Sequence, residues 1–299
     1  MTFLTIFTAP KPFTNPHIAV IQRNALQAWA RLEDVEVLLI GDEPGIPEIA
    51  REMCVRNVRK VERDGKGIPI VRSVMQIGHA QSDSPVLCFA NADMILMSDM
   101  VEAARQASRQ VQDFLLVGQR WNLDLSEPFD FGGDWEARLR AEVSRHGQFY
   151  SPWGIDYFVF PRHLYTDVPD FTIGRPAWDN WMVYHACTVF GMAVDASRDV
   201  LVIHQNHDYS HLPGNKPPYG SEVAKSNLAK AGGRKRVFNI LDTNRELVNG
   251  LIRRPQVRLV RILRRLERIF INNQGKGWSW ELSIRLQQMQ RPLSIRPRR

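Results

Sequence analysis

The chain has 299 residues, of which 44% are hydrophobic and 24% are charged, the composition of an ordinary globular protein. This length can bury one large core, alone or with a small appendage. No window reaches the roughly 18 apolar residues of a membrane span, and residues 1–7 lack the basic start and cleavage site of a secretory signal. The unpatterned cysteines Cys54, Cys88 and Cys187 predict buried thiols in a reducing, cytoplasmic compartment.

The net charge of +7 is unevenly distributed along the chain. Residues 234–299 contain 17 Lys and Arg against 4 Asp and Glu, which is +13, so residues 1–233 carry −6. We therefore expect only the C-terminal part to seek anionic partners.

The first part of the chain predicts alternating strands and helices. Asn15 and Pro16 supply an N-cap and a first-turn proline for the first helix. Such alternation predicts an α/β fold with a mostly parallel, Rossmann-like central sheet flanked by helices. Ligands of these sheets collect at the carboxyl ends of the strands, here residues 8–11, 41–43, 91–93 and 119–121. We expect strands at 3–8, 35–40, 53–61, 86–90 and 114–118, and helices at 18–29, 68–79 and 101–111.

The rest of the chain is less regular. Residues 120–220 are rich in Trp, Gly, Pro, Asp and His, and predict loops and short elements. Within them we expect a helix over 181–189 that starts at Asp179, and a strand over 200–203. Beyond Gly233 the chain turns basic. Residues 251–272 predict an amphipathic helix whose start Pro255 breaks, and residues 273–299 predict a loose Arg- and Pro-rich tail.

Asn91 and Asp93 directly follow the apolar strand 86–90. A carboxylate at the end of a buried strand is costly unless it binds something. Two residues apart on an extended chain, both side chains point the same way and can reach a divalent ion with its phosphates. The alternative is an Asp that caps the next helix, although Ser98 and Asp99 already resemble that cap.

Two further segments offer polar groups among tryptophans. Trp153, Gly154 and Asp156 form one of them: glycine allows close backbone approach to a ligand, and Asp156 can hold a sugar hydroxyl or only its own turn. Trp178 and Asp179 form the other. Asp179 at a helix start is either a plain N-cap or a base, with the helix dipole favouring its charged form. Tryptophans here either stack on sugar rings or fill the core.

Histidines cluster after the strand at 200–203. His204, His207 and His211 lie within eight residues, together with Asp208. Neutral imidazole is a good ligand for a divalent transition ion, and this is not a zinc-finger spacing. Lys216, in the Gly- and Pro-rich segment that follows, is expected to meet a diphosphate as a point charge.

The order of these motifs is an acidic pair, a glycine loop, an Asp at a helix start and a late histidine. It resembles the nucleotide-sugar glycosyltransferases of the GT-A fold, broadly the family 2-like group. The resemblance implies a GT-A domain over residues 1–245, followed by a basic helical extension over 246–299. Residues 1–120 would be its nucleotide-sugar-binding half and 121–245 its acceptor and catalytic half.

The resemblance also implies roles for individual residues. Asp93, with His204 or His207, would hold Mn²⁺ or Mg²⁺, weakened because Asn91 replaces the first acid of the family motif. Asp179 matches the catalytic base of inverting members. Thr8, Asp42 and Arg72 lie where nucleotide contacts are expected, and Trp153, Gly154, Asp156 and Trp178 where the acceptor is expected. The segment 211–217 also resembles one found in retaining members, which leaves the stereochemical outcome open.

The activity expected from these features is transfer of a sugar from a nucleotide-diphosphate donor to an acceptor hydroxyl, in cell-surface polysaccharide or glycoconjugate synthesis. The main alternative is a non-catalytic carbohydrate- or nucleotide-binding module of the same fold. A nucleotidyltransferase is disfavoured because residues 8–12 contain no glycine.

The basic region 251–299 leaves three interpretations open. It is a helix packed on the core, a peripheral contact with an anionic membrane that carries a lipid-linked acceptor, or a nucleic-acid-binding segment. The last is disfavoured because aromatic residues are not interleaved with the charges.

Overall fold

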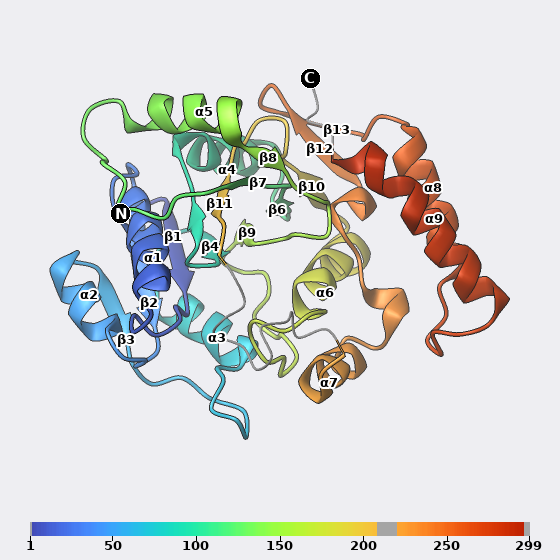
Figure 1. Ribbon diagram of the computed structural model, residues 1–299, viewed down its shortest axis with the longest axis horizontal. Coiled ribbons are helices and arrows are strands. Elements are labelled where there is room, and N and C mark those ends of the chain that lie inside the picture. The colour runs from blue at the N-terminus through green and yellow to red at the C-terminus, as the bar shows by residue number, and fades with distance from the viewer. Residues whose placement is uncertain (1, 208–219, 296–299) are drawn as a thin grey trace.

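The computed structural model describes residues 2–207 and 220–295. Within them, nine strands form a central sheet in the order β13-β12-β10-β6-β9-β4-β1-β2-β3 (Figure 1). Only the pairs that involve β9 or β13 are antiparallel, so the predicted mostly parallel α/β sheet is confirmed. The strands are β1 (Leu4–Thr8), β2 (Val35–Ile40), β3 (Arg56–Val58), β4 (Val86–Ala90), β6 (Leu115–Val117), β9 (Tyr157–Pro161), β10 (Ala193–Asp195), β12 (Arg245–Val248) and β13 (Leu251–Arg253).

Helices cover both faces of this sheet. In β4, Cys88 belongs to the apolar cluster on one face, whereas Leu87 and Phe89 belong to the cluster on the other. A strand that is buried on both sides needs apolar residues at every position, which explains the uninterrupted apolar run. One face is covered by α1 (Pro16–Trp29), α2 (Ile46–Glu52), α4 (Ser98–Gln110) and α5 (Trp135–His146), and the other by α3 (Val71–Gln81) and α6 (Trp178–His185).

Several predicted boundaries agree with the structure. β2 and β4 have the predicted bounds, and α1 begins at Pro16 with the Asn15 side chain accepting a hydrogen bond from the Ile18 N–H. Others differ. The strand expected at 53–61 is only three residues long, and the helix expected at 181–189 begins at Trp178 and ends in a π-helical turn, Ala186–Phe190.

The cap predicted for α4 is also wrong. The helix already includes Ser98, and Met97 precedes it without a side-chain cap. Asp99 instead accepts a hydrogen bond from the Leu201 N–H and pairs with Arg140 of α5. It therefore joins three segments that are distant in the sequence.

A second, smaller sheet lies beside the carboxyl ends of the central strands. Its order is β5-β11-β7-β8, formed by β5 (Met94–Ile95), β11 (Ile203–Gln205), β7 (Trp121–Leu123) and β8 (Gln148–Phe149). β5 pairs antiparallel with β11, and β11 pairs parallel with β7. These short strands join the segment after β4 to the late histidines, which the central sheet alone would not do.

The C-terminal region differs most from its prediction. Leu251 and Ile252 belong to β13 and not to a helix, so the central sheet continues past residue 245. Leu259–Phe270 forms α8, and the tail expected to be loose contains a second helix, α9 (Trp278–Ser294). The two helices lie together at one end of the molecule (Figure 1). α7 (Glu222–Lys230) precedes them on the side of α6.

α8 packs on the rest of the molecule through arginines. Arg261 is 5% exposed and pairs with Asp195 and Glu246 of the sheet edge, and Arg264 is fully buried and pairs with Asp242 and Glu267. The outer stripe of α8 is apolar, at helical spacing. It consists of Leu259 (61% exposed), Ile262 (41%), Leu266 (41%) and Ile269 (70%).

Two smaller findings complete the fold. Cys88 is buried as predicted, but Cys54 is exposed and Cys187 half-buried, so the prediction of three buried thiols is wrong. In the described parts of the chain, no helix combines the length and the apolar character needed to cross a membrane.

Candidate active site

The antiparallel pairing of β5 with β11 brings Asp93 to the late histidines. In its register, His204 lies opposite Met94, and Ile203 lies opposite Ile95. The Gln205 N–H continues the pattern by donating a 3.1 Å hydrogen bond to the Asp93 carbonyl oxygen. Strand pairing therefore fixes the two segments against each other although they are more than a hundred residues apart.

Asp93, His204 and His207 form a compact group of possible metal ligands. Asp93 Oδ2 lies 3.2 Å from His207 Nε2 and 3.8 Å from His204 Nε2. Each residue offers one ligand atom, and these three atoms all lie within 4.8 Å of one another. All three side chains are at most 14% exposed. A carboxylate and two imidazoles suit Mn²⁺ or a similar ion.

The electrostatics of this group also fit a cation. Burial lowers the pKa of His204 to about 4, against the opposing effect of Asp93, so its imidazole is neutral near pH 7. Although burial acts in the opposite direction, His204, His207 and Lys11 hold the pKa of Asp93 well below its usual range. Asp93 Oδ1 and His204 Nδ1 are buried without a hydrogen-bond partner. Buried polar atoms of this kind call for a ligand or an ion.

A cavity of about 610 Å³ opens next to the group. It is bounded by the segment after β1, the segment after β4, the loop before β9 and the start of α6, which is where an α/β sheet binds its ligands. The sequence-predicted residues that line it are Asn91, Asp93, Trp153, Gly154, Asp156, Asp179, His204 and His207. The acidic motif, the glycine loop and the helix-start Asp thus meet in one place.

Asp179 lies in the first turn of α6, and the N-cap position is taken by Ala177 in a left-handed conformation. Its Oδ1 is buried and has no hydrogen-bond partner. Burial raises the pKa of Asp179 to about 7, with Asp156 adding to the effect. The backbone groups at the helix start favour the charged form, as expected, but desolvation outweighs them.

Asn91 and Asp156 are bound to each other. Asn91 Nδ2 donates a 2.9 Å hydrogen bond to Asp156 Oδ1, and Arg120 forms an ion pair with the other carboxylate oxygen. The Asn91 amide nitrogen is thus held by Asp156, while the side chain lines the cavity together with Asp93. An Asn at this position lets the buried Asp156 carboxylate gain a donor, which a second Asp would not provide.

Gly154 has a packing reason as well as a place in the cavity wall. A Cβ at this position would lie 2.6 Å from Tyr150 Cδ1. The Tyr150 ring is in turn covered by the Arg120 guanidinium at 4.4 Å. The close backbone approach that glycine allows here is an approach to Tyr150.

Three of the expected nucleotide contacts do not line the cavity. Thr8 is buried just before the lining begins at Ala9, Asp42 is exposed and pairs with Arg63, and Arg72 pairs with Glu62 and Asp170. The charges of Asp42 and Arg72 are taken up by neighbouring ion pairs, whereas the Thr8 hydroxyl is buried without a hydrogen-bond partner. Lys216 lies outside the described residues, as do His211 and the rest of segment 211–217.

Trp178, expected at the acceptor, does not line the cavity either. It is 4% exposed, and its ring packs 5.3 Å from Phe89 and 5.2 Å from Phe158, measured between centroids. It belongs to the core under α6. Trp153, by contrast, lines the cavity and carries the Arg264 guanidinium 4.8 Å from its ring centroid.

Ligand positions were predicted from the sequence at strand ends 8–11, 41–43 and 119–121, but the charged residues in them were not named, and Arg63 and Arg175 were missed. Lys11 is the clearest: burial lowers its pKa, although the Asp93 carboxylate opposes that change. Its position in the segment after β1 was the available signal. Arg120 follows β6 in the same way. The charged lining residues not named from the sequence are Lys11, Glu43, Arg63, Arg120 and Arg175.

Comparison with known proteins finds no matching protein-family model and no matching curated protein. Among solved structures, glucosyl-3-phosphoglycerate synthase from Mycobacterium tuberculosis, in complex with Mn²⁺, UDP-Glc and phosphoglyceric acid, is 16% identical, with a TM-score of 0.46 over 86% of this chain and 88% of that chain. A mannosyltransferase from Pyrobaculum calidifontis, in complex with GDP-Man and Mn²⁺, is 13% identical, with a TM-score of 0.47 over 77% of this chain and 62% of that chain. The likeness is a distant one in fold, and the function of the present chain has to follow from its own residues.

Proposed function

We propose that this chain is a metal-dependent glycosyltransferase that moves a sugar from a nucleotide-diphosphate donor to an acceptor hydroxyl. The observation that carries the proposal is the convergence of the Asp93, His204 and His207 group with Asp179 in one cavity at the carboxyl ends of the strands. UDP- and GDP-sugars with Mn²⁺ or Mg²⁺, as in the similar structures, are the first donors and ions to test.

The cavity supplies charges of both signs for such a donor. Asp93, His204 and His207 would hold the ion, and the buried Asp93 Oδ1 and His204 Nδ1 atoms, which have no hydrogen-bond partner, support this role. The bound ion would act as a Lewis acid on the leaving diphosphate. Lys11 and Arg175, which also line the cavity, place positive charge where diphosphate oxygens can be bound.

Asp179 is the proposed base. Its Oδ1 has no partner in the protein, and a pKa of about 7 suits a group that must accept a proton near neutral pH. The acceptor oxygen forms a bond to the anomeric carbon as its proton passes to Asp179. The bond from that carbon to the diphosphate oxygen breaks, and its electron pair leaves with the nucleoside diphosphate, which inverts the configuration.

The first experiment is a thermal-shift panel of nucleoside diphosphates with and without Mn²⁺, because a ligand that binds only the folded state raises its stability. We expect one diphosphate to give a Mn²⁺-dependent rise that Asp93→Ala abolishes and Asp42→Asn retains. Asp42 is a matched control, since it is an exposed acid outside the cavity. A rise that is unaffected by Asp93→Ala would contradict the proposed site.

A second experiment separates an enzyme from a non-catalytic binding module of the same fold. The purified chain is incubated with the nucleotide-sugar of the selected base and with Mn²⁺, and nucleoside diphosphate release is measured. We expect slow hydrolysis that falls by about 10²–10⁴-fold in Asp179→Asn, with donor binding unchanged. Donor binding without any release, in the presence of carbohydrate acceptors, would favour the binding module.

We further propose that the acceptor is lipid-linked and that the chain works at the inner face of a membrane, in glycoconjugate or cell-surface polysaccharide synthesis. The support is the outer stripe of α8, which exposes four apolar side chains in a row. Exposed Arg253, Arg254 and Arg265 lie on the same element or just before it. Apolar side chains flanked by arginines suit an anionic lipid surface.

The membrane contact is tested by liposome co-sedimentation of Ile262→Glu/Ile269→Glu. We expect the double variant to lose binding to anionic vesicles, whereas Val189→Glu, at another exposed apolar position (63% exposed), keeps it. Equal binding of both proteins would rule out this surface. Point substitutions are preferable to removal of residues 251–299, which would leave the buried acids Asp195 and Glu246 without Arg261.

A further inference from the structure

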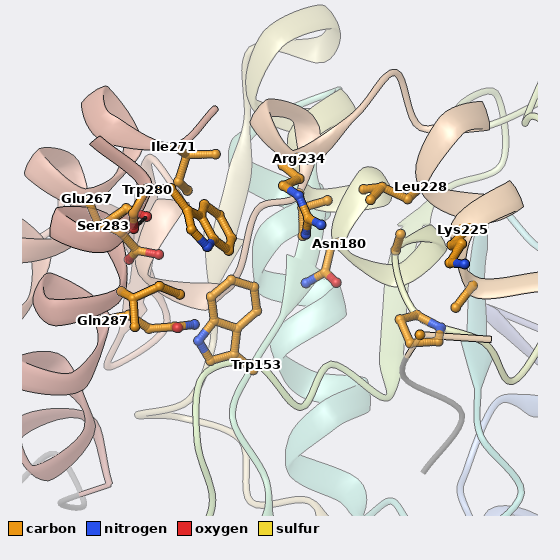
Figure 2. Close-up of a pocket in the computed structure, with 16 residues that line it drawn as sticks. Trp153, Asn180, Lys225, Leu228, Arg234, Glu267, Ile271, Trp280, Ser283 and Gln287 are labelled. Carbon is orange, nitrogen blue, oxygen red and sulfur yellow. Dashed lines mark hydrogen bonds between the residues drawn. The ribbon is translucent and has the colours of Figure 1, made fainter. Parts of the chain in front are cut away.

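A second cavity, of about 440 Å³, lies between the main body and the C-terminal helices. Side chains from α6 and α7 form one side of it, and side chains from α8, α9 and the segment between them form the other (Figure 2). Its size falls in the range of small-molecule sites. Neither the ion group nor the proposed base lines it.

The second cavity shares a wall with the first. Trp153 lines both of them. Pro176, Ala177 and Asn180 also line the second cavity, while Asp179, within the same short segment, lines the first. The start of α6 and the Trp153 indole therefore contribute to the walls of both spaces.

The lining is mainly apolar, with positive charge on one side. Leu228, Ile271, Trp280 and Ile284 contribute hydrocarbon and aromatic surface. Arg234 contributes a guanidinium that lies 5.0 Å from the Trp280 ring centroid, and its Nε is buried without a hydrogen-bond partner. Figure 2 shows the Trp153 and Trp280 indoles in the middle of the view, with Arg234 and Asn180 on one side of them.

The second cavity also adjoins the proposed membrane surface. Ile271 lines it and lies two residues after Ile269 of the outer stripe. Trp280 lines it and lies two residues after Trp278, which is 74% exposed and contacts Phe270 at the end of α8. Two residues span at most about 7 Å of chain, so exposed apolar residues lie close along the chain to two of the lining residues.

We infer that the second cavity binds the hydrocarbon chain of a phosphate-linked lipid acceptor, and that Arg234 meets its phosphate. The inference rests on the proposed transferase function and deepens it by locating the binding site of the lipid-linked acceptor. An apolar chain buried there gains the hydrophobic transfer energy of each methylene. Its polar end is held at the wall that Trp153 and the start of α6 share with the donor cavity.

The probe for this inference is bromododecyl phosphate, whose bromine quenches tryptophan fluorescence on contact. The titration uses a Trp278→Phe background, so that this exposed indole does not report, and stays below the concentration at which the probe forms micelles. We expect saturable quenching, because Trp153 and Trp280 line the cavity. Replacement of Trp280 by Phe in addition should remove part of the quenched signal.

A filling substitution tests the location. Ala224 and Leu228 lie four residues apart on α7 and both face the cavity, whereas Ala229 is exposed. Ala224→Phe should weaken probe binding about tenfold or more, equivalent to roughly 1.4 kcal/mol, and Ala229→Phe should leave it unchanged. If Ala224→Phe does not fold, Leu228→Trp serves the same purpose on the next turn of the helix.

The outcomes separate this inference from the proposed function. Mn²⁺-dependent nucleoside diphosphate binding should persist in Ala224→Phe, and probe quenching should persist in Asp93→Ala. An absence of quenching, or equal quenching in Ala224→Phe and Ala229→Phe, would overturn the lipid site and leave the transferase proposal standing. If the wild-type chain binds no nucleoside diphosphate, the transferase proposal is overturned, whether or not the probe is quenched.

Discussion

Substitution of Asp179 by Asn is expected to remove activity and to stabilise the protein at alkaline pH. Burial raises the pKa of Asp179 from the ordinary 3.8 to about 7. Below pH 3.8 the carboxyl is protonated in both the folded and the unfolded chain, so it does not lower the free energy of unfolding. Between 3.8 and 7 the unfolded chain loses the proton first, so stability falls as pH rises, and above 7 the full loss persists.

The size of the loss follows from the pKa. At about 1.4 kcal/mol per pKa unit, the change from 3.8 to about 7 corresponds to roughly 4 kcal/mol. Asn mimics the protonated carboxyl and carries no such penalty. We therefore expect Asp179→Asn to exceed the wild type in unfolding free energy by up to about 4 kcal/mol at pH 8, and by less than about 1 kcal/mol at pH 4.

The assay is urea denaturation of both proteins at pH 8 and pH 4, without donor or metal. In parallel, kcat/KM of the wild type should fall about tenfold for each pH unit below 7, because the fraction of ionised base falls in that proportion. Equal stability of the two proteins at pH 8 would refute the argument that a buried, unpartnered carboxylate is kept at this position. If Asp179→Asn is more stable but transfers the sugar at an unchanged rate, Asp179 is not the catalytic base.

Three further predictions follow from the contacts. His204→Ala should weaken Mn²⁺ affinity at least about tenfold by calorimetric titration, while His79→Ala, away from the cavity, should not change it. Arg264→Met should lower the unfolding free energy by about 3–5 kcal/mol, since Asp242 and Glu267 lose their buried partner, and the exposed neighbour Arg265→Met should cost less than about 0.5 kcal/mol. Trp178→Ala should lower the unfolding free energy by about 3–5 kcal/mol through lost core packing. Donor affinity of the folded protein should not change, and a weakened affinity would indicate that Trp178 contacts the ligand.

The central sheet was predictable because its strands are buried on both faces. β4 is an uninterrupted apolar run, and β2 is apolar except for Glu36 near its half-buried start; both are bounded by polar residues, which define their ends. α1 was equally clear, since Asn15 and Pro16 mark its start. The small second sheet could not be predicted, because β5 has only two residues and no pattern of its own. Its existence depends on pairing with β11 more than a hundred residues later.

The candidate site was predictable as a set of motifs but not as a set of contacts. Asp93, His204, His207 and Asp179 do reach one cavity. The spacing of Asn91 and Asp93 suggested that both face an ion, but Asp156, 65 residues away in the sequence, binds the Asn91 amide. The pKa of Asp179 likewise depends on burial by several distant segments, which a local helix-dipole argument cannot include.

The C-terminal region shows how charge placement decides which face of a helix is buried. An amphipathic pattern alone favours burial of all the apolar residues, yet α8 buries Arg261 and Arg264 alongside Val260 and Leu263 and leaves its outer stripe exposed. The reason is the set of acids opposite the helix, since Asp195, Asp242 and Glu246 would be buried without a counter-charge if the helix were rotated.

This orientation has a consequence for the two cavities. Arg264 is fixed by Asp242 and Glu267, and its guanidinium covers the Trp153 ring that both cavities share. Glu267 also accepts a 2.8 Å hydrogen bond from Gln290 of α9, which joins the second helix to the same network. The contacts that turn the apolar stripe of α8 outward therefore also hold the indole that both cavities share.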